Sequence, residues 1–190
     1  MANLPEEESF IINSIKYDCI SMCMDNNATH VIQRIILCID ETKRQTLNMI
    51  LLNNLKILIT DCNGICVIKK FINSNKSEVI KKKILEELTF NGLEYIQSPF
   101  GNYAVQHILQ EWGFDTCYEL VDIILKNVYS LSMQKFSSNV IEKFLELADT
   151  KNRNIIIREL YNPGKILGLL KNKYGNIILH KTLFYFRARK

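Results

Sequence analysis

The sequence contains few chain breakers, with only seven glycines and three prolines in 190 residues. A sandwich or barrel of many short strands needs frequent turn residues, so this scarcity excludes that class and favours helices joined by short connections. No apolar run approaches the roughly 18 residues that cross a bilayer. The N-terminus is acidic where a signal peptide would be basic and then apolar. We therefore expect a cytoplasmic protein that makes no membrane contact.

Signatures of metal binding and catalysis are also missing. The six cysteines include no CxxC pair, and in the cytosol their thiols are expected to be reduced. Zinc coordination by Cys19, Cys23, His30 and Cys38 is the alternative to a role as small core residues, but their spacing fits no common structural zinc site. No Ser/His/Asp set, carboxylate pair or phosphate-binding loop occurs at usable spacing. We predict no enzymatic activity, no metal and no cofactor.

The charge is modest and unevenly distributed. The net charge is +4, with five Lys/Arg against seven Asp/Glu in residues 1–60 and nineteen against thirteen in residues 61–190. A mildly basic C-terminal two thirds permits an anionic partner without requiring one.

A repeat runs through the chain. Five eight-residue segments align, and their positions are numbered 1 to 8 from the first residue of each: 27–34, 63–70, 100–107, 136–143 and 174–181. A second apolar stretch with helical spacing precedes each segment, so every unit is predicted to form two helices. Units that cannot bury their apolar face alone must stack, which predicts an all-α fold, an α-solenoid of five repeats. We expect one domain over residues 1–190, with repeats at 8–43, 44–80, 81–117, 118–153 and 154–190. The second residue of each segment is small, at separations of 36, 37, 36 and 38 positions: Ala28, Gly64, Gly101, Ser137 and Gly175.

Each segment has two predicted faces. Positions 5 and 6 are apolar in all five and are expected in the core, whereas positions 3 and 7 lie one helical turn apart beside position 4 on the opposite face. Stacked repeats would align these exposed triplets in a ladder. Its members are Thr29/His30/Gln33, Ile65/Cys66/Lys69, Asn102/Tyr103/Gln106, Ser138/Asn139/Glu142 and Asn176/Ile177/His180.

Position 8 is basic or imidazole in every segment. Solvated or ion-paired side chains on a helix flank are one interpretation, and contact with phosphate groups is the other. The candidates for phosphate contact are Arg34, Lys70, Lys143 and Lys181.

The best-developed triplets have side chains suited to reading bases. Asn102 and Gln106 can pair with a base edge, and Tyr103 offers a ring for stacking, which is a known mode of single-stranded RNA recognition. The Glu142 carboxylate only accepts hydrogen bonds, so it suits the N1–H and N2–H₂ edge of guanine.

Two segments carry a family resemblance. GNYAVQHIL at 101–109 and KFSSNVIEK at 135–143 resemble the last-but-two and last-but-one repeats of the Pumilio (PUF) family of RNA-binding proteins, and the similarity extends over residues 8–190. This resemblance implies a curved array of three-helix repeats. Their concave face would bind single-stranded RNA antiparallel, with the C-terminal repeat on the 5′ base.

The resemblance also implies a base for each triplet. Asn with Gln reads uracil, Ser with Glu reads guanine, and a small residue with Gln reads adenine. The target implied is therefore 5′-UGUNA-3′. Uracil is assigned to Asn102/Gln106 with Tyr103 stacking, guanine to Ser138/Glu142 with Asn139 packing between bases, and adenine to Thr29/Gln33 with His30 stacking.

Two triplets depart from the family pattern. Asn176 keeps the uracil-type first residue, but Ile177 replaces the usual aromatic residue and His180 the usual Gln, which weakens the 5′ uracil contact. The Ile65, Cys66 and Lys69 triplet departs altogether, so it is expected to tolerate any base, with Lys69 at most touching a phosphate.

The family typically has eight repeats, and the five found here correspond to its C-terminal part. The chain is either a fragment of a larger array or a short natural member. The resemblance implies binding to mRNA 3′ untranslated regions and lower translation or message stability through recruited proteins. We expect a monomer. The alternative function is a protein-binding solenoid that has lost RNA reading, which the two departing triplets favour.

Overall fold

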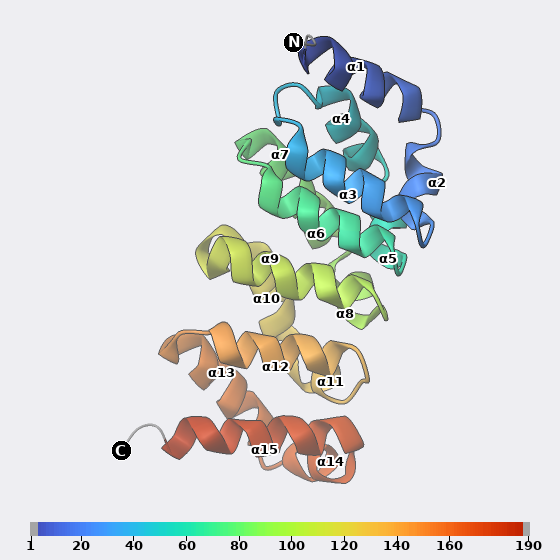
Figure 1. Cartoon of the computed structure of the whole chain (residues 1–190). Helices are drawn as coiled ribbons and strands as arrows, with labels where there is room; N and C mark the ends of the chain where they lie inside the picture. The colour runs from blue at the N-terminus through green and yellow to red at the C-terminus, as the bar shows by residue number, and fades with distance from the viewer. Residues whose placement is uncertain (1–3, 188–190) are drawn as a thin grey trace. The chain divides into compact units, whose positions relative to one another are not determined.

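The chain is helical throughout the part described. A computed structural model describes residues 4–187, with side chains from residue 7 to residue 184, and contains fifteen helices and no strand in that range (Figure 1). None of these helices combines the length and apolar composition that a membrane crossing requires. The chain divides into two compact units, residues 1–87 and 88–190, which are described separately below.

The first unit contains six complete helices and most of a seventh. In it α2 packs on α3, α5 packs on α6, and α3 and α6 pack against each other. Figure 1 shows α3 and α6 side by side. The helices are α1 (Leu4–Ile15), α2 (Cys19–Met24), α3 (Ala28–Cys38), α4 (Gln45–Asn53), α5 (Leu55–Thr60), α6 (Gly64–Ser74) and α7 (Glu78–Phe90).

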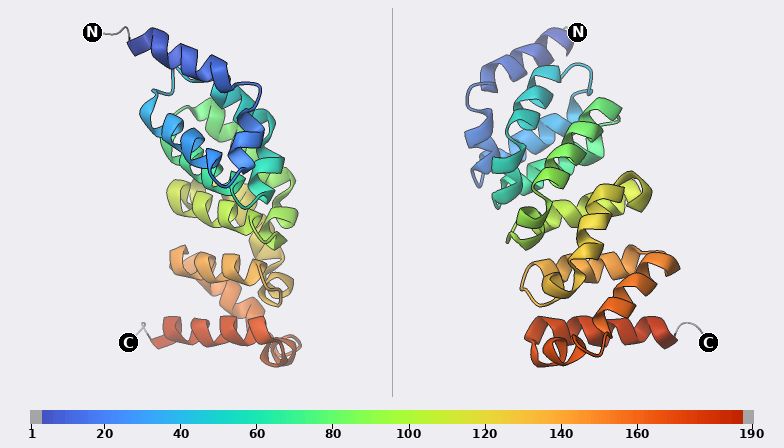
Figure 2. Two further views of the ribbon diagram at one scale, coloured as in Figure 1. Left: turned by 45° about the vertical axis from the view of Figure 1, so that its right-hand side comes forward. Right: turned by 180° about the vertical axis from the view of Figure 1, so that it is seen from behind.

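The second unit repeats this arrangement. Helix α12 packs between α9 and α15, and the three form a row in Figure 1 that both views of Figure 2 preserve. Seen from behind, α10 and α13 lie in front of this row (Figure 2). The helices are α8 (Gly92–Gln97), α9 (Gly101–Thr116), α10 (Tyr118–Lys126), α11 (Val128–Ser132), α12 (Ser137–Leu147), α13 (Thr150–Leu160), α14 (Ile166–Lys171) and α15 (Lys173–Arg187).

The all-α solenoid class is confirmed. Each repeat has three helices, and the third one, which carries the motif, is α3, α6, α9, α12 or α15. Within each unit the repeats stack through these third helices. The prediction of two helices per repeat is wrong, because a short helix precedes each motif helix, as the family resemblance implied. These short helices span five or six residues. That is less than two turns, too short for apolar periodicity to register.

The small residue of the motif is explained by a close approach of the backbone. A Cβ on Gly64 would lie 2.6 Å from the carbonyl oxygen of Leu58 in the preceding short helix. In α12 the Ser137 hydroxyl donates to the Leu131 carbonyl at 2.6 Å instead. In both cases the residue meets a carbonyl six positions earlier in the chain. The same crowding occurs at Gly101 and Gly175.

Polar side chains fix where the third helices begin. The Asp25 carboxylate accepts the backbone N–H groups of Asn27 at 2.9 Å and Ala28 at 2.8 Å. These hydrogen bonds hold the pKa of Asp25 below its ordinary value because they favour the ionised form. Sequence reasoning did not identify this cap. Equivalent bonds at the starts of α6, α9 and α15 are accepted by Asp61, Ser98 and Asn172.

Two core predictions are wrong. Position 6 is buried in all five motifs, but at position 5 Val31 is 50% exposed, because α3 has only one neighbouring third helix, α6, in its unit. Cys19 and Cys23 are buried as expected, whereas Cys38 is exposed at the end of α3. All six cysteines are free thiols. Between residues 4 and 187 no three metal-ligating side chains gather.

An arginine caps helix C-termini in each unit; Arg44 is buried and Arg153 is half-buried. The Arg44 guanidinium donates to the carbonyls of Ile36 and Ile39, the latter at 2.7 Å, and to the Ser74 hydroxyl at 2.8 Å. It thereby joins the C-terminal ends of α3 and α6. In the second unit Arg153 donates to the carbonyls of Leu145 and Ala148 at the end of α12. Arg44 and Arg153 occupy equivalent places, because each follows the small residue of its motif by sixteen positions.

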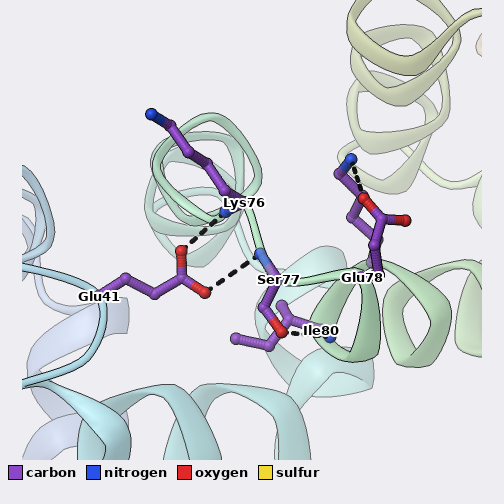
Figure 3. A network of polar contacts seen from close by, with 6 residues as sticks. Glu41, Lys76, Ser77, Glu78 and Ile80 are labelled. Carbon is purple, nitrogen blue, oxygen red and sulfur yellow. Dashed lines mark hydrogen bonds and ion pairs between the residues drawn. The ribbon is translucent and has the colours of Figure 1, made fainter.

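A second polar link in the first unit joins neighbouring connections. The Glu41 carboxylate accepts the backbone N–H groups of Lys76 at 2.7 Å and Ser77 at 3.2 Å, just before α7 begins (Figure 3). The connection after α3 therefore holds the connection after α6. This contact between successive repeats stabilises the spacing at which α3 and α6 pack.

Candidate nucleic-acid interface

The triplet on α9 is preorganised by hydrogen bonds. The Asn102 amide nitrogen donates to the carbonyls of Ser98 at 2.9 Å and Pro99 at 3.0 Å. Its Oδ1 accepts from the Gln106 Nε2 at 2.9 Å. Asn102 is fully buried, whereas the Tyr103 side chain beside it is 49% exposed. The predicted proximity of positions 3 and 7 is therefore present, and Asn102 orients Gln106.

The triplet on α12 has a different arrangement. Ser138 is buried, and its hydroxyl donates to the Lys135 carbonyl at 3.2 Å. Asn139 is exposed, and Glu142 is half-buried. The Glu142 carboxylate forms an ion pair with Lys181 on the neighbouring helix α15. The residue predicted to read guanine thus has a cationic partner within the protein.

Two grooves meet at Glu142. One, of about 310 Å³, lies between α9 and α12 and is lined by Tyr103, Gln106, Asn139, Glu142, Lys143 and Glu146. The other, of about 400 Å³, lies between α12 and α15 and is lined by Glu142, Glu146, Lys181 and Phe184. The Lys143 ammonium pairs with Glu146 at 3.1 Å, so two carboxylates and two ammonium groups balance along these grooves.

The triplet on α15 is more open. Asn176, Ile177 and His180 are all exposed, and the Asn176 amide donates to the Leu170 carbonyl at 3.2 Å. The His180 ring packs edge-on against Phe184, with centroids 5.6 Å apart. This triplet therefore offers an imidazole and a phenyl ring where α9 offers an amide and a phenol.

In the first unit only the triplet on α3 has side chains at positions 3 and 7 that can both form hydrogen bonds with a base edge. On α3 the Gln33 amide donates to the Thr29 hydroxyl at 3.3 Å, and His30 is exposed beside them. On α6 the Ile65 side chain is buried, Cys66 is exposed and Lys69 is half-buried. Because Ile65 is apolar and buried, it presents no hydrogen-bonding group to a ligand.

The prediction of a fully exposed triplet is wrong for position 3. Only position 4 is exposed in all five motifs, and position 7 is half-buried in four of them. Position 3 is buried on α3, α6, α9 and α12, and on α3 and α9 its side chain accepts a hydrogen bond from the amide at position 7. The exposed exception is Asn176 on α15. The buried members are Thr29, Ile65, Asn102 and Ser138.

The position 8 residues fall into two groups. Arg34 and Lys70 are exposed, whereas Lys143 and Lys181 are half-buried and ion-paired with groove carboxylates. The phosphate role of all four stays a prediction.

Sequence reasoning missed one row of exposed residues, although its signal was present. Position 11 of each motif lies one helical turn beyond position 7 and is exposed in all five. In the second unit this row contributes Glu146 and Phe184 to the grooves. Counting four residues beyond position 7 in each aligned segment identifies all five members of this row, which are Leu37, Asn73, Gln110, Glu146 and Phe184.

Comparison with known proteins agrees with this geometry. The family model of the "Pumilio-family RNA binding repeat" matches residues 18–51, 57–89, 93–125 and 127–161, together more than half of the chain. The chain belongs to the Pumilio family. The four matched segments include the motifs of α3, α6, α9 and α12.

Several Pumilio proteins are similar over nearly the whole chain. Pumilio homolog 12 of Arabidopsis thaliana is 34% identical over 185 residues, covering 96% of this chain and 30% of its own length. Pumilio homology domain family member 4 of Saccharomyces cerevisiae is 28% identical, covering 94% of this chain and 20% of its own length. The chain therefore spans a third or less of these relatives.

Solved structures show the same fold. The Puf4 RNA binding domain bound to an HO endonuclease RNA 3′ UTR recognition sequence superposes with a TM-score of 0.89 at 25% identity. The match covers 100% of this chain and 59% of that one. The RNA-binding domain of yeast Puf5p bound to SMX2 RNA matches 88% of this chain with a TM-score of 0.73, also at 25% identity.

Proposed function

We propose that this protein binds single-stranded RNA in a sequence-specific manner through the triplets of its third helices. The observation that carries the proposal is the groove of about 310 Å³ between α9 and α12. It brings a half-exposed tyrosine ring, an oriented amide and a carboxylate to one surface. Aromatic rings stack on bases, while amides and carboxylates pair with base edges.

The proposed target is a 5′-UGUNA-3′ element. Guanine is read by Ser138 and Glu142, since a carboxylate accepts from two guanine N–H groups and repels the acceptor edges of other bases. The central uracil is read by Asn102 and Gln106. The proposed order of bases, from the C-terminal triplet to the N-terminal one, is U at Asn176/His180, G, U, any base at Cys66/Lys69, and A at Thr29/Gln33.

The test is an exchange of reading residues between two helices. Because α9 accommodates Asn and Gln at positions 3 and 7, the double substitution Ser138→Asn/Glu142→Gln should move the preference of α12 from G to U. One well-made base contact discriminates by about 1–3 kcal/mol, so the ratio of dissociation constants for UGU and UUU RNA should change by at least about fivefold.

The matched control makes the same chemical changes away from the grooves. Ser130→Asn/Glu119→Gln alters exposed residues of α11 and α10 and should leave the preference as in the wild type. Equal binding of the wild-type protein to UGU and UUU RNA would refute the proposed function. A preference that does not follow the exchange would refute the assignment of guanine to Glu142.

Electrostatic attraction supplies part of the proposed affinity. Arg34 and Lys70 are exposed on the flanks of their helices, where they can approach phosphates. Each phosphate contact releases counterions, so the logarithm of the binding constant should fall linearly with the logarithm of salt concentration.

The proposed organisation is a single domain of five repeats. The repeats span residues 8–43, 44–80, 81–117, 118–153 and 154–190. Residues 188–190 lie outside those the structure describes.

The cellular role follows from the family resemblance and is proposed with it. A cytoplasmic, monomeric protein that binds mRNA 3′ untranslated regions would lower translation or message stability by recruiting protein co-repressors. Reporter messages with and without the UGU element, compared in cells that make the protein, test this role. Equal expression of both reporters would count against it.

A protein-binding scaffold is the second candidate, and Ile65 favours it. A buried isoleucine on α6 interrupts the reading surface of the first unit, so that unit has only one complete reading triplet, on α3. Under the scaffold alternative, RNA binding would be weak and indifferent to sequence. The exchange experiment separates the two candidates, because only an RNA reader changes its base preference with its residues.

A further inference from the structure

The ion pair between Glu142 and Lys181 lies on the reading surface itself. Glu142 is on α12 and Lys181 on α15, and their side chains are 36% and 42% exposed. Both line the groove of about 400 Å³, and Glu142 also lines the neighbouring groove with Tyr103 and Gln106. The lysine of one repeat therefore holds the carboxylate of the preceding repeat at the point where the two grooves meet.

Another lysine occupies the same motif position without this contact. Lys143 pairs with Glu146, three residues later on the same helix, at 3.1 Å. Lys143 and Lys181 are both half-buried, and both balance a carboxylate of the grooves. They differ in one respect, because only Lys181 contacts the side chain assigned to guanine.

We propose that Lys181 is a positioning residue that sets the guanine preference of Glu142, an inference that rests on the proposed RNA-binding function. A carboxylate has about four acceptor sites on its two oxygens. The Lys181 ammonium occupies part of one oxygen and leaves the rest for guanine N1–H and N2–H₂. The ion pair also restrains rotation of a part-exposed side chain.

The restraint matters most when the base is wrong. A free glutamate facing uracil would rotate toward solvent and avoid the clash of acceptor with acceptor. A glutamate held by Lys181 has to break that ion pair to turn away, so the acceptor edge of a mismatched base stays opposite the carboxylate, which is costly. Specificity at this base therefore depends on a residue in the next repeat, and removal of Lys181 relaxes rejection of uracil more than it changes binding of guanine.

The experiment compares Lys181→Met with Lys143→Met in binding to UGU and UUU RNA. Each substitution removes one positive charge from the grooves. We expect Lys143→Met to weaken binding of both RNAs by the same factor and to keep the wild-type ratio. We expect Lys181→Met to lower the ratio of the dissociation constant for UUU RNA to that for UGU RNA by about fivefold, in the range that coupled charges at part-exposed sites produce.

Two further variants secure the interpretation. Lys181→Arg retains an ion-pair donor and should keep the wild-type ratio. In a Glu142→Gln background, where the carboxylate is gone, Lys181→Met should change the ratio no further. Thermal unfolding of each variant checks that the fold is intact, and Lys181→Gln, which also removes the ammonium group, tests the proposal if Lys181→Met does not fold.

The outcomes separate this proposal from the function it rests on. A wild-type protein that binds both RNAs equally overturns the proposed function and this proposal with it. A guanine preference that survives Lys181→Met unchanged overturns only the positioning role. Equal changes of ratio in Lys143→Met and Lys181→Met also overturn it, because the effect would then belong to charge alone.

Discussion

Replacement of Tyr103 by alanine tests the base-stacking role of position 4. The ring is 49% exposed and lines the groove between α9 and α12. Stacking of one base on an aromatic side chain contributes about 1–3 kcal/mol, so Tyr103→Ala should weaken binding of UGU RNA by about 5- to 150-fold, at about 1.4 kcal/mol per tenfold. Fluorescence anisotropy with labelled RNA measures this loss.

The same substitution should affect folding little. Full burial of a large apolar side chain stabilises by roughly 1.5–3 kcal/mol, and this ring is half-buried, so its removal should cost about 1 kcal/mol. No charge is lost, so the salt dependence of RNA binding should keep its slope. Tyr103→Phe keeps the ring and should bind nearly as the wild type does.

The matched control is Tyr118→Ala on α10. Tyr118 is 65% exposed and lines neither groove around Glu142. Its removal should leave RNA binding unchanged. If Tyr103→Ala binds as tightly as the wild type, or if Tyr118→Ala loses as much affinity, the grooves beside α9 and α12 do not hold the bases.

Three further predictions concern stability and reactivity. Gly64→Ala should destabilise the protein by up to about 2 kcal/mol in urea unfolding, since steric strain of about 1–3 kcal/mol opposes a helix-propensity gain of about 1 kcal/mol. Gly164→Ala, where a Cβ meets only ordinary contacts, should be nearly neutral. Arg44→Met should cost about 2–4 kcal/mol by leaving the C-terminal carbonyls of α3 unpaired, and an unchanged melting temperature would contradict this role. Burial raises the pKa of the Cys117 thiol to about 12, so this thiol stays protonated at pH 8 and should react with Ellman's reagent only after unfolding. Prompt reaction of more than three thiols in the native protein would contradict the burial pattern, in which the reactive ones are Cys38, Cys62 and Cys66.

The repeat was accessible from the sequence because its cause is local. A small residue recurs where the third helix meets a backbone carbonyl six positions earlier, so three of the seven glycines fall at one motif position. The apolar stretches before each motif correctly indicated the first helices. The short helices escaped detection, since five or six residues hold too few apolar positions to show a period.

The burial of the triplets was not accessible in the same way. Periodicity places Asn102, Tyr103 and Gln106 on one side of their own helix, but it does not say how closely the next helix approaches. In the structure α12 packs against α9, Asn102 is fully buried, and Tyr103 remains exposed. The structure thus divides one predicted patch into an exposed ring and a buried support for Gln106.

The sequence by itself determined the helical class, the five motifs and the residue types offered at each reading position. These follow from the spacing of residues along the sequence, because the fixed geometry of the helix places residues three and four apart on the same face. Only the tertiary structure decided that Lys181 of α15 pairs with Glu142 of α12. These two residues are nearly forty positions apart and meet through the packing of α12 and α15. Whether Lys143 or Lys181 pairs with Glu142 depends on distances between helices, which the periodicity of one helix does not encode.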